Sequence, residues 1–310
     1  MRNALPRCLA VLLASTALAH EGPEHEIEEL TERMKKNGET AELLTERAVE
    51  YRVLGKLAEA TKDLERAAAL DPTSLPTRRE LARVLFLDGK ADDALAEVSR
   101  ALKLEAEEPV DTASLRVLRA EILRSKNDNK KALEDCDAAL ELHKQNPEWF
   151  LLRSDIQRRL KAHKERLAGL EEGIAETGAG VLEIERVEAM IDAGQPDAAL
   201  LVIARELEES RIKSSWLIRR ARAQLVLGKK AAAETDLKDA LEEIAQRLNP
   251  KTPDAPLLLD KALAHELLGE KKDALRGYEE ARDKGADGLQ EKIKSLQDPP
   301  PAEVKKDAPK

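Results

Sequence analysis

Residues 44–72 read LTERAVEYRVLGKLAEATKDLERAAALDP and contain the pattern that decides the fold. A glycine is followed by an alanine, a large apolar residue and a second alanine, at Gly55, Ala60, Leu64 and Ala67. The stretch IRRARAQLVLGKKAAAETDLKDAL, at 218–241, has the same frame. The first alanine of the frame has equivalents along the chain at Ala60, Ala94, Ala132, Arg166, Ala199, Ala233 and Ala274. Their intervals of 34, 38, 34, 33, 34 and 41 residues indicate a 34-residue repeat with two insertions.

Each repeat is predicted to form two helices. Apolar residues spaced as on one helical face predict a helix over 41–54, and Gly55 ends it by adopting a left-handed conformation. A second helix is predicted over 57–70, because Asp71-Pro72 cannot continue it. The two insertions, at about 105–112 and 246–256, are expected in connections between repeats, where added length costs little.

The composition favours an all-α chain. Of the 310 residues, 42% are hydrophobic but only 2% are aromatic, so the apolar content is mainly Ala, Leu, Val and Ile. Strands draw on aromatic and β-branched residues, whereas Ala, Leu, Glu, Lys and Arg favour helix. Because one helical pair cannot cover its own apolar face, each repeat is expected to stack on the next.

The 34-residue period and the Gly, Ala, apolar, Ala, Asp-Pro sequence resemble the tetratricopeptide repeat. The resemblance covers residues 41–284 as seven repeats and implies a right-handed α-solenoid with capping helices at its ends. Repeats four and five depart from the pattern, where local distortion is expected, at Arg166, Gly173, Val187 and Glu206. The pentatricopeptide repeat, which has a 35-residue period and binds RNA, fits less well with an acidic chain.

The two ends differ from the repeats. Residues 1–19 combine basic residues, a short apolar run and a small-residue end at Ala19, which predicts a cleavable signal peptide and a secreted or periplasmic protein. Residues 20–40 are expected to form an acidic leader and a capping helix, and 285–297 a second capping helix. The Pro- and Lys-rich tail, 298–310, is expected to be disordered.

Charge and motifs narrow the function. The chain has 52 basic and 61 acidic residues, a net charge of −9, which disfavours nucleic-acid binding. Phosphate-binding loops, nucleophile elbows and zinc motifs do not occur in the sequence, so neither an enzyme nor a cofactor is expected. Apolar runs long enough to span a membrane are also missing, and Cys136 is expected to be buried and inert. The sequence therefore predicts a non-catalytic scaffold that binds a protein or an extended peptide.

The resemblance implies that partners bind in a concave groove lined by the first helix of each repeat. The partner-binding residues it implies are Arg79, Arg83, Phe86, Arg124, Arg158, Arg159 and Arg222, with Glu121 and Asp155 on the same surface. Arginines along one surface favour an acidic partner. In the other interpretation these bases pair with acids of adjacent helices. The chaperone-binding clamp of this family is not expected, because Thr45 and Val49 replace its Lys and Asn.

Two further functions stay open. Cleavage after Ala19 would place a free α-amine beside the imidazole of His20, with His25 nearby, and such a set chelates copper or zinc. The chain would then be a metal-handling exported protein, although a flexible polar leader is the simpler interpretation and no metal site is predicted. The other alternative is an assembly factor for an envelope complex.

Overall fold

The computed structural model describes residues 22–104, 108–286 and 288–297, and within these ranges the chain is helical without strands. The predicted all-α class is therefore confirmed. The chain divides into two compact units, unit 1 ending at His143 and unit 2 beginning at Lys144. The predicted signal peptide, 1–19, and the tail, 298–310, lie outside the described residues.

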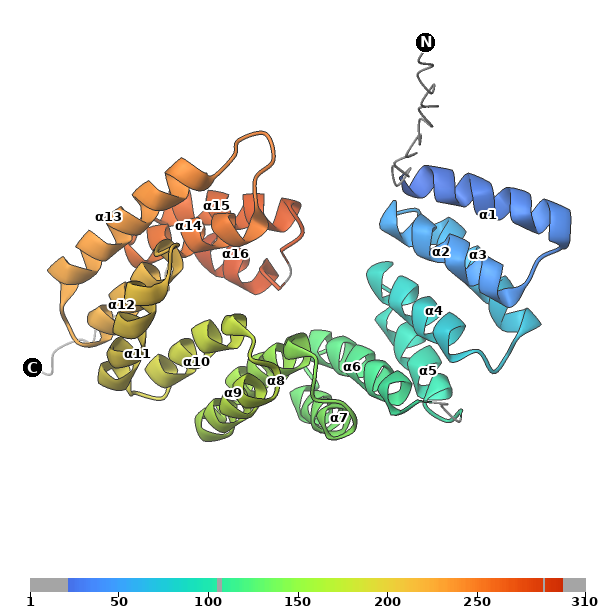
Figure 1. Cartoon of the computed structure of the whole chain (residues 1–310), viewed down its shortest axis with the longest axis horizontal. Helices are drawn as coiled ribbons and strands as arrows, with labels where there is room; N and C mark the ends of the chain where they lie inside the picture. The colour runs from blue at the N-terminus through green and yellow to red at the C-terminus, as the bar shows by residue number, and fades with distance from the viewer. Residues whose placement is uncertain (1–21, 105–107, 287, 298–310) are drawn as a thin grey trace, which may run out of the picture. The chain divides into compact units, whose positions relative to one another are not determined.

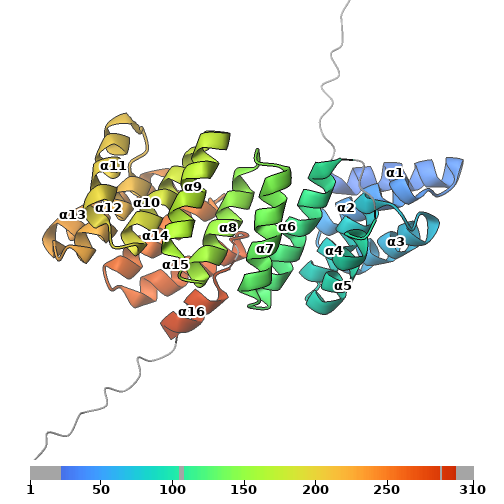
Figure 2. The same ribbon diagram turned by 90° about the horizontal axis from the view of Figure 1, so that it is seen from below.

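Unit 1 contains the helices of the first three repeats and one helix before them. These are α1 (Pro23–Asn37), α2 (Ala41–Val53), α3 (Leu57–Leu70), α4 (Leu75–Leu87), α5 (Ala91–Ala101), α6 (Pro109–Ser125) and α7 (Asn129–Leu142). Figure 1 labels them in order, and Figure 2 shows α6 and α7 lying side by side.

Unit 2 contains the helices of the last four repeats and one helix after them. These are α8 (Pro147–Arg159), α9 (His163–Thr177), α10 (Gly180–Asp192), α11 (Pro196–Glu209), α12 (Ser214–Val226), α13 (Lys230–Arg247), α14 (Ala255–Leu267), α15 (Lys271–Asp283) and α16 (Gln290–Gln297).

The helices pack as a solenoid within each unit. We call the first helix of each repeat its A helix (α2, α4, α6, α8, α10, α12 and α14) and the second its B helix (α3, α5, α7, α9, α11, α13 and α15). Each A helix packs on the B helix of its own repeat and on the A helix of the next repeat in the same unit. This packing produces one layer of A helices and one layer of B helices in each unit. We call the side of the A-helix layer that points away from the B helices the A-helix face of that unit.

The turn between A and B helices follows the repeat frame closely. Its residue has a positive φ in all seven repeats, and five of these residues are glycines, such as Gly55 at 71°. The other two are Asn127 at 60° and Lys161 at 59°, the positions where the sequence shows weaker copies of the frame. The turn therefore has the same backbone geometry even where another residue replaces glycine, although a positive φ is unfavourable for lysine.

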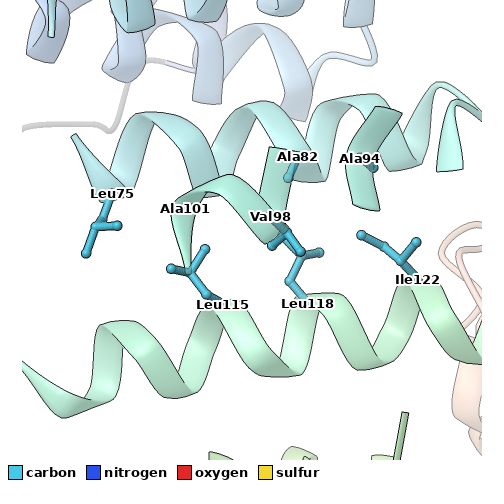
Figure 3. Close-up of a cluster of buried hydrophobic side chains, with 8 residues drawn as sticks. All are labelled: Leu75, Ala82, Ala94, Val98, Ala101, Leu115, Leu118 and Ile122. Atoms are coloured by element: carbon cyan, nitrogen blue, oxygen red, sulfur yellow. The ribbon is translucent and has the colours of Figure 1, made fainter. Parts of the chain in front are cut away.

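Small residues of the frame lie at the closest helix crossings. In repeat 2, Ala82 of α4 and Ala94 of α5 are fully buried against α6. Figure 3 shows these alanines with the apolar side chains of α6. The cluster consists of Leu75, Ala82, Ala94, Val98, Ala101, Leu115, Leu118 and Ile122. Close approach of the helices and filling by large side chains together produce the dense packing expected of a core.

The departures in repeats four and five are accommodated without breaks in α9, α10 or α11. At Gly173, a Cβ atom would lie 2.7 Å from Phe150 Cγ and 2.9 Å from Leu182 Cδ1, so the glycine makes room for these two side chains. Val187 is fully buried. The large side chain of Arg166 is buried by a different arrangement, described below.

The insertions do not lie only in connections, as expected from the sequence. Helix α6 has 17 residues and α13 has 18, whereas α2 has 13 and α3 has 14. Pro109 starts α6 at a position where proline is favourable, and the added residues of α13 are mainly helix formers. Part of the added length therefore extends two helices.

An ion pair to a buried aspartate joins the A and B helices of repeats one, three and six. In repeat one, Arg47 Nε and Nη2 donate to Asp63 Oδ2 and Oδ1 at 2.7 and 2.9 Å. The equivalent bidentate pairs are Arg119 with Asp135 and Arg220 with Asp236, and each arginine precedes its aspartate by 16 residues. Hydrogen bonding to the aspartate raises the pKa of each arginine. Such planar two-bond pairs fix the angle between the two helices.

The outer helices cover apolar residues of the terminal repeats. Leu30 and Met34 of α1 are buried against α2 and α3. At the other end, Ile293 of α16 packs beside Tyr278 of α15. None of the helices in the described ranges combines the length and apolarity needed to cross a membrane.

Candidate functional site

The A-helix layer of unit 1 presents a mixed basic and apolar stripe on α4. Arg83 follows Arg79 by four residues, and Phe86 and Leu87 follow Arg83 by three and four, so all four lie along one side of the helix. Arg79 Nη1 donates to Ser114 Oγ of α6 at 3.0 Å and lies 3.6 Å from Asp111 Oδ1. Phe86 is half-buried against the cluster of Figure 3. Arg79 and Phe86 thus both contact α6, and part of each side chain is covered by it.

Arg83 differs from its neighbours on the stripe. Within the part of the chain that the structure describes, its guanidinium makes no hydrogen bond or ion pair. Leu87, one turn further along, has 55% of its surface exposed. Val53 occupies the equivalent place on α2, 34 residues earlier, and is also exposed. An unmatched cation between apolar side chains is what a partner-binding surface offers.

Arg124 also belongs to the A-helix layer of unit 1. It is half-buried on α6 and already interacts with another group of the chain, as does Glu121. Of the residues predicted in this unit, Arg79, Arg83 and Phe86 therefore form one stripe, and Arg124 lies on the neighbouring A helix.

The arginines predicted in unit 2 are paired with carboxylates. Asp155 of α8 accepts from Arg158 Nη2 and, at 3.1 Å, from Arg159 Nε. Arg222 of α12 donates from Nη2 to Asp192 Oδ1 of α10 at 2.6 Å, and its Nη1 contacts Glu188 Oε2. The interpretation in which basic residues pair with acids on adjacent helices thus describes Arg222, whereas Arg158 and Arg159 pair within their own helix.

Arg166 was not predicted as a site residue, yet it lies at the centre of the charges in unit 2. Its side chain is 1% exposed, although it stands where most repeats have alanine. Its guanidinium donates to Ser154 Oγ at 3.0 Å, to Asp192 Oδ2 at 2.6 Å and to Glu185 Oε1 at 2.5 Å. Ser154 is the small residue of the A helix in the same repeat, which leaves room for the arginine.

A cavity of about 450 Å³ opens beside Arg166 within unit 2. Its lining is entirely charged and comes from α8, α9, α10 and α12: Arg158, Arg166, Glu185, Glu188, Asp192 and Arg222. Burial, followed by repulsion from Arg166, lowers the pKa of Arg222 below its usual value. Three guanidinium groups and three carboxylates therefore line one cavity, in which Arg166 is buried and Arg158 is half exposed.

Metal donors come together at one place in the described residues. His265, Glu270 and Asp273 have donor atoms within 4.8 Å of one another, and His265 Nδ1 lies 2.6 Å from Glu270 Oε2. Arg276 already binds Asp273 at 2.7 Å, and the positive end of α15 lies at the cluster. Both features oppose a cation. The alternative metal site cannot be placed, because His20 lies outside the described residues.

Comparison with known proteins agrees with this architecture. Residues 54–116 match the sequence profile of the tetratricopeptide repeat family. A tetratricopeptide repeat protein from Parabacteroides merdae has a similar fold, with a TM-score of 0.60 and 18% identity over 88% of this chain and 97% of that one. None of the curated protein sequences matches the chain significantly.

Two further solved structures have the same fold. The C-terminal part of a repeat-containing protein from Cytophaga hutchinsonii gives a TM-score of 0.54 at 15% identity, covering 82% of this chain and 100% of that one. A chain of the APC/C hetero-tetramer Cut9-Hcn1 gives 0.54 at 14% identity, covering 80% and 46%. At these identities the likeness concerns the fold. Together with the sequence match over residues 54–116 and the helical pairs of the described residues, it shows that this chain has the tetratricopeptide-repeat fold.

Proposed function

We propose that this protein is a non-catalytic scaffold, exported from the cytoplasm, that binds a protein or an extended peptide on the A-helix face of unit 1. The observation that supports this most strongly is Arg83, which has no partner among the described residues and is followed by the exposed Leu87. Proteins of this repeat family generally act as interaction scaffolds rather than as enzymes. Two neighbouring A helices contribute exposed apolar residues to the same face, Val53 and Leu87.

The chemistry of the face favours a partner segment with a carboxylate beside an apolar side chain. A carboxylate pairs with Arg83 in a charge-assisted hydrogen bond, and the apolar group covers Leu87. Binding energy at such contacts is concentrated in a few arginine and apolar anchors. Val53 and Leu87 extend the apolar contact across two repeats, which suits an extended chain rather than a single side chain.

Substitutions at Leu87 and Arg83, with a control at a leucine of nearly equal exposure, test this surface. Leu87→Asp and Arg83→Glu are expected to weaken binding to acidic and apolar peptides on an array about tenfold each, whereas Leu70→Asp leaves it unchanged. Leu70 ends the B helix α3 and is 54% exposed, so it matches Leu87 except in position. Binding should also weaken as salt rises. Equal binding by all three variants would remove the α4 stripe from the proposal.

Export is supported by the pattern of residues 1–19. We expect the exported chain to begin at His20, as determined by mass spectrometry of the intact protein. A chain that retains Met1 to Ala19 outside the cytoplasm would contradict the cleavage.

A further inference from the structure

An exposed leucine lies on the outer side of the B helix α11 in unit 2. Leu201 has 76% of its surface exposed, more than any other large apolar residue that the structure describes. The other B helices have small or polar residues at this place, two residues after the first position of the frame: Lys62, Ala96, Glu134, Ala168, Thr235 and Arg276. The repeat itself therefore does not require a leucine here. Because single exposed leucines are common, the residues around it decide what it indicates.

The residues beside Leu201 form a stripe of small and charged side chains. Ala198 and Ala204 stand three residues before and after it, and Asp197 and Arg205 stand four residues before and after it. These spacings place all five residues on one side of α11. Apart from Ala198, which is half-buried, all of them are exposed. The stripe is therefore open to a partner along its whole length.

The charged groups of this stripe have little to bind within the chain. Among the described residues, Asp197 and Glu208, which is one turn beyond Ala204, make no hydrogen bond or ion pair. Arg205 binds only the adjacent Glu206 in the same part of the chain, at 2.9 Å, and its side chain is 58% exposed. Since a guanidinium has five N–H groups, Arg205 keeps donors for a second carboxylate. Both signs of charge are thus available on one surface.

We infer that α11 pairs with the α11 helix of a second copy of this chain, antiparallel and about a two-fold axis at Leu201. In such a pair, each residue faces the one that is equally far from Leu201 in the opposite direction. Ala204 then lies against the partner's Ala198, and these small side chains let the two helices approach to about 8–10 Å. Arg205 faces the partner's Asp197, and the symmetry repeats this ion pair.

The charges also exclude the parallel arrangement of the same two helices. A parallel two-fold pair would place Arg205 against the partner's Arg205 and Asp197 against the partner's Asp197. Like charges directly opposite each other oppose association. The stripe is therefore complementary to itself in one direction only, which is what an isologous contact requires.

A cavity beside α11 allows a further ion pair. It has a volume of about 370 Å³, and its lining includes Lys164 of α9 and residues of the turn 193–195. Glu208 stands seven residues after Leu201, so it faces the partner's Gly194, seven residues before it. This brings the carboxylate of Glu208 to the side of the partner's Lys164. The ammonium group of Lys164 makes no ion pair with the described residues of its own chain.

Contact through one helix of each copy makes a small interface. Stable complexes bury about 1,200 Å² or more, which a single pair of helices does not reach, so we expect a dissociation constant of about 10–100 µM. The chain is then a monomer at about 1 µM, where unfolding is followed by fluorescence, and a dimer when concentrated. The interface is on unit 2 and is independent of the surface proposed on α4.

Sedimentation equilibrium of the full mature chain, from about 1 to 300 µM, tests the inference. We expect a reversible equilibrium between monomer and dimer. Leu201→Asp should raise the dissociation constant about a hundredfold, because the substitution enters the interface twice at about tenfold each. Val226→Asp should leave it unchanged, since Val226 is 58% exposed in the same unit but lies on α12. Tryptophan fluorescence verifies that unit 2 stays folded in both variants.

Exchange of the charges tests the two-fold register. Asp197→Arg and Arg205→Asp each place like charges opposite one another, so neither variant alone should dimerise. An equimolar mixture should dimerise about as well as the natural chain, because the acidic positions of one variant face the basic positions of the other. A natural chain that stays monomeric throughout, equal association of Leu201→Asp and Val226→Asp, or a mixture that does not associate would each overturn the inference.

Discussion

Arg166→Met is expected to lower the free energy of unfolding of unit 2 by about 3–5 kcal/mol, the usual cost of removing one partner of a buried ion pair. Methionine has a similar length, so it keeps most of the packing volume but cannot donate hydrogen bonds. Glu185 and Asp192 would each lose a charge-assisted bond at 2.5 and 2.6 Å, and Ser154 would lose a donor. The cost comes from the carboxylates left behind rather than from the arginine itself.

Tryptophan fluorescence during urea unfolding measures this change in unit 2 alone. The sequence has two tryptophans, and both Trp149 and Trp216 belong to that unit. Arg205→Met is the control, because that arginine is exposed on α11 and, among the residues that the structure describes, pairs only with the adjacent Glu206. We expect the control to change stability by less than about 0.5 kcal/mol. Equal midpoints for the two variants would show that the Arg166 contacts do not stabilise the unit.

Ala94→Arg is expected to unfold most of unit 1, with a loss of about 3 kcal/mol or more. Ala94 occupies in repeat 2 the place that Arg166 occupies in repeat 4. Its surroundings are apolar, with Leu118 and Ile122 of α6 beside it (Figure 3). An arginine there would overfill the crossing and bury a charge without a carboxylate.

Circular dichroism reports the loss of helix, and tryptophan fluorescence shows whether unit 2 keeps its fold. Ala96→Arg introduces the same side chain two residues further along α5 at an exposed position, so it should leave both signals unchanged. If Ala94→Arg retained the helicity of that control, the assignment of the frame to close helix crossings would be wrong.

Much of the fold could be predicted because the repeat restricts each position in the same way seven times. The helices expected over 41–54 and 57–70 are observed as Ala41–Val53 and Leu57–Leu70. The turn residues keep a positive φ even at Asn127 and Lys161, since the angle between the two helices requires it. Cys136 is buried in α7, as its place beside the alanines of the frame indicates.

The charged residues were less predictable, because their partners come from other helices. Asp192 is 26 residues along the sequence from Arg166 and 30 from Arg222. These sequence separations match neither the helical period nor the 34-residue repeat. The interpretation of Arg166 as a source of distortion missed that a serine and two carboxylates surround it. One signal was available in the sequence: Arg47 and Asp63 have equivalents at the same 16-residue spacing in two other repeats.

Photo-crosslinking in the organism that makes the protein tests the proposed binding face most directly. A photoreactive amino acid is incorporated in place of Leu87 in one chain and in place of Leu70 in another, because the two leucines have nearly equal exposure in the same unit. If a partner binds the A-helix face, position 87 forms a specific protein adduct in the exported fraction, position 70 does not, and Arg83→Glu abolishes the adduct. An adduct that forms only at position 70, or that persists with Arg83→Glu, would contradict binding through this face.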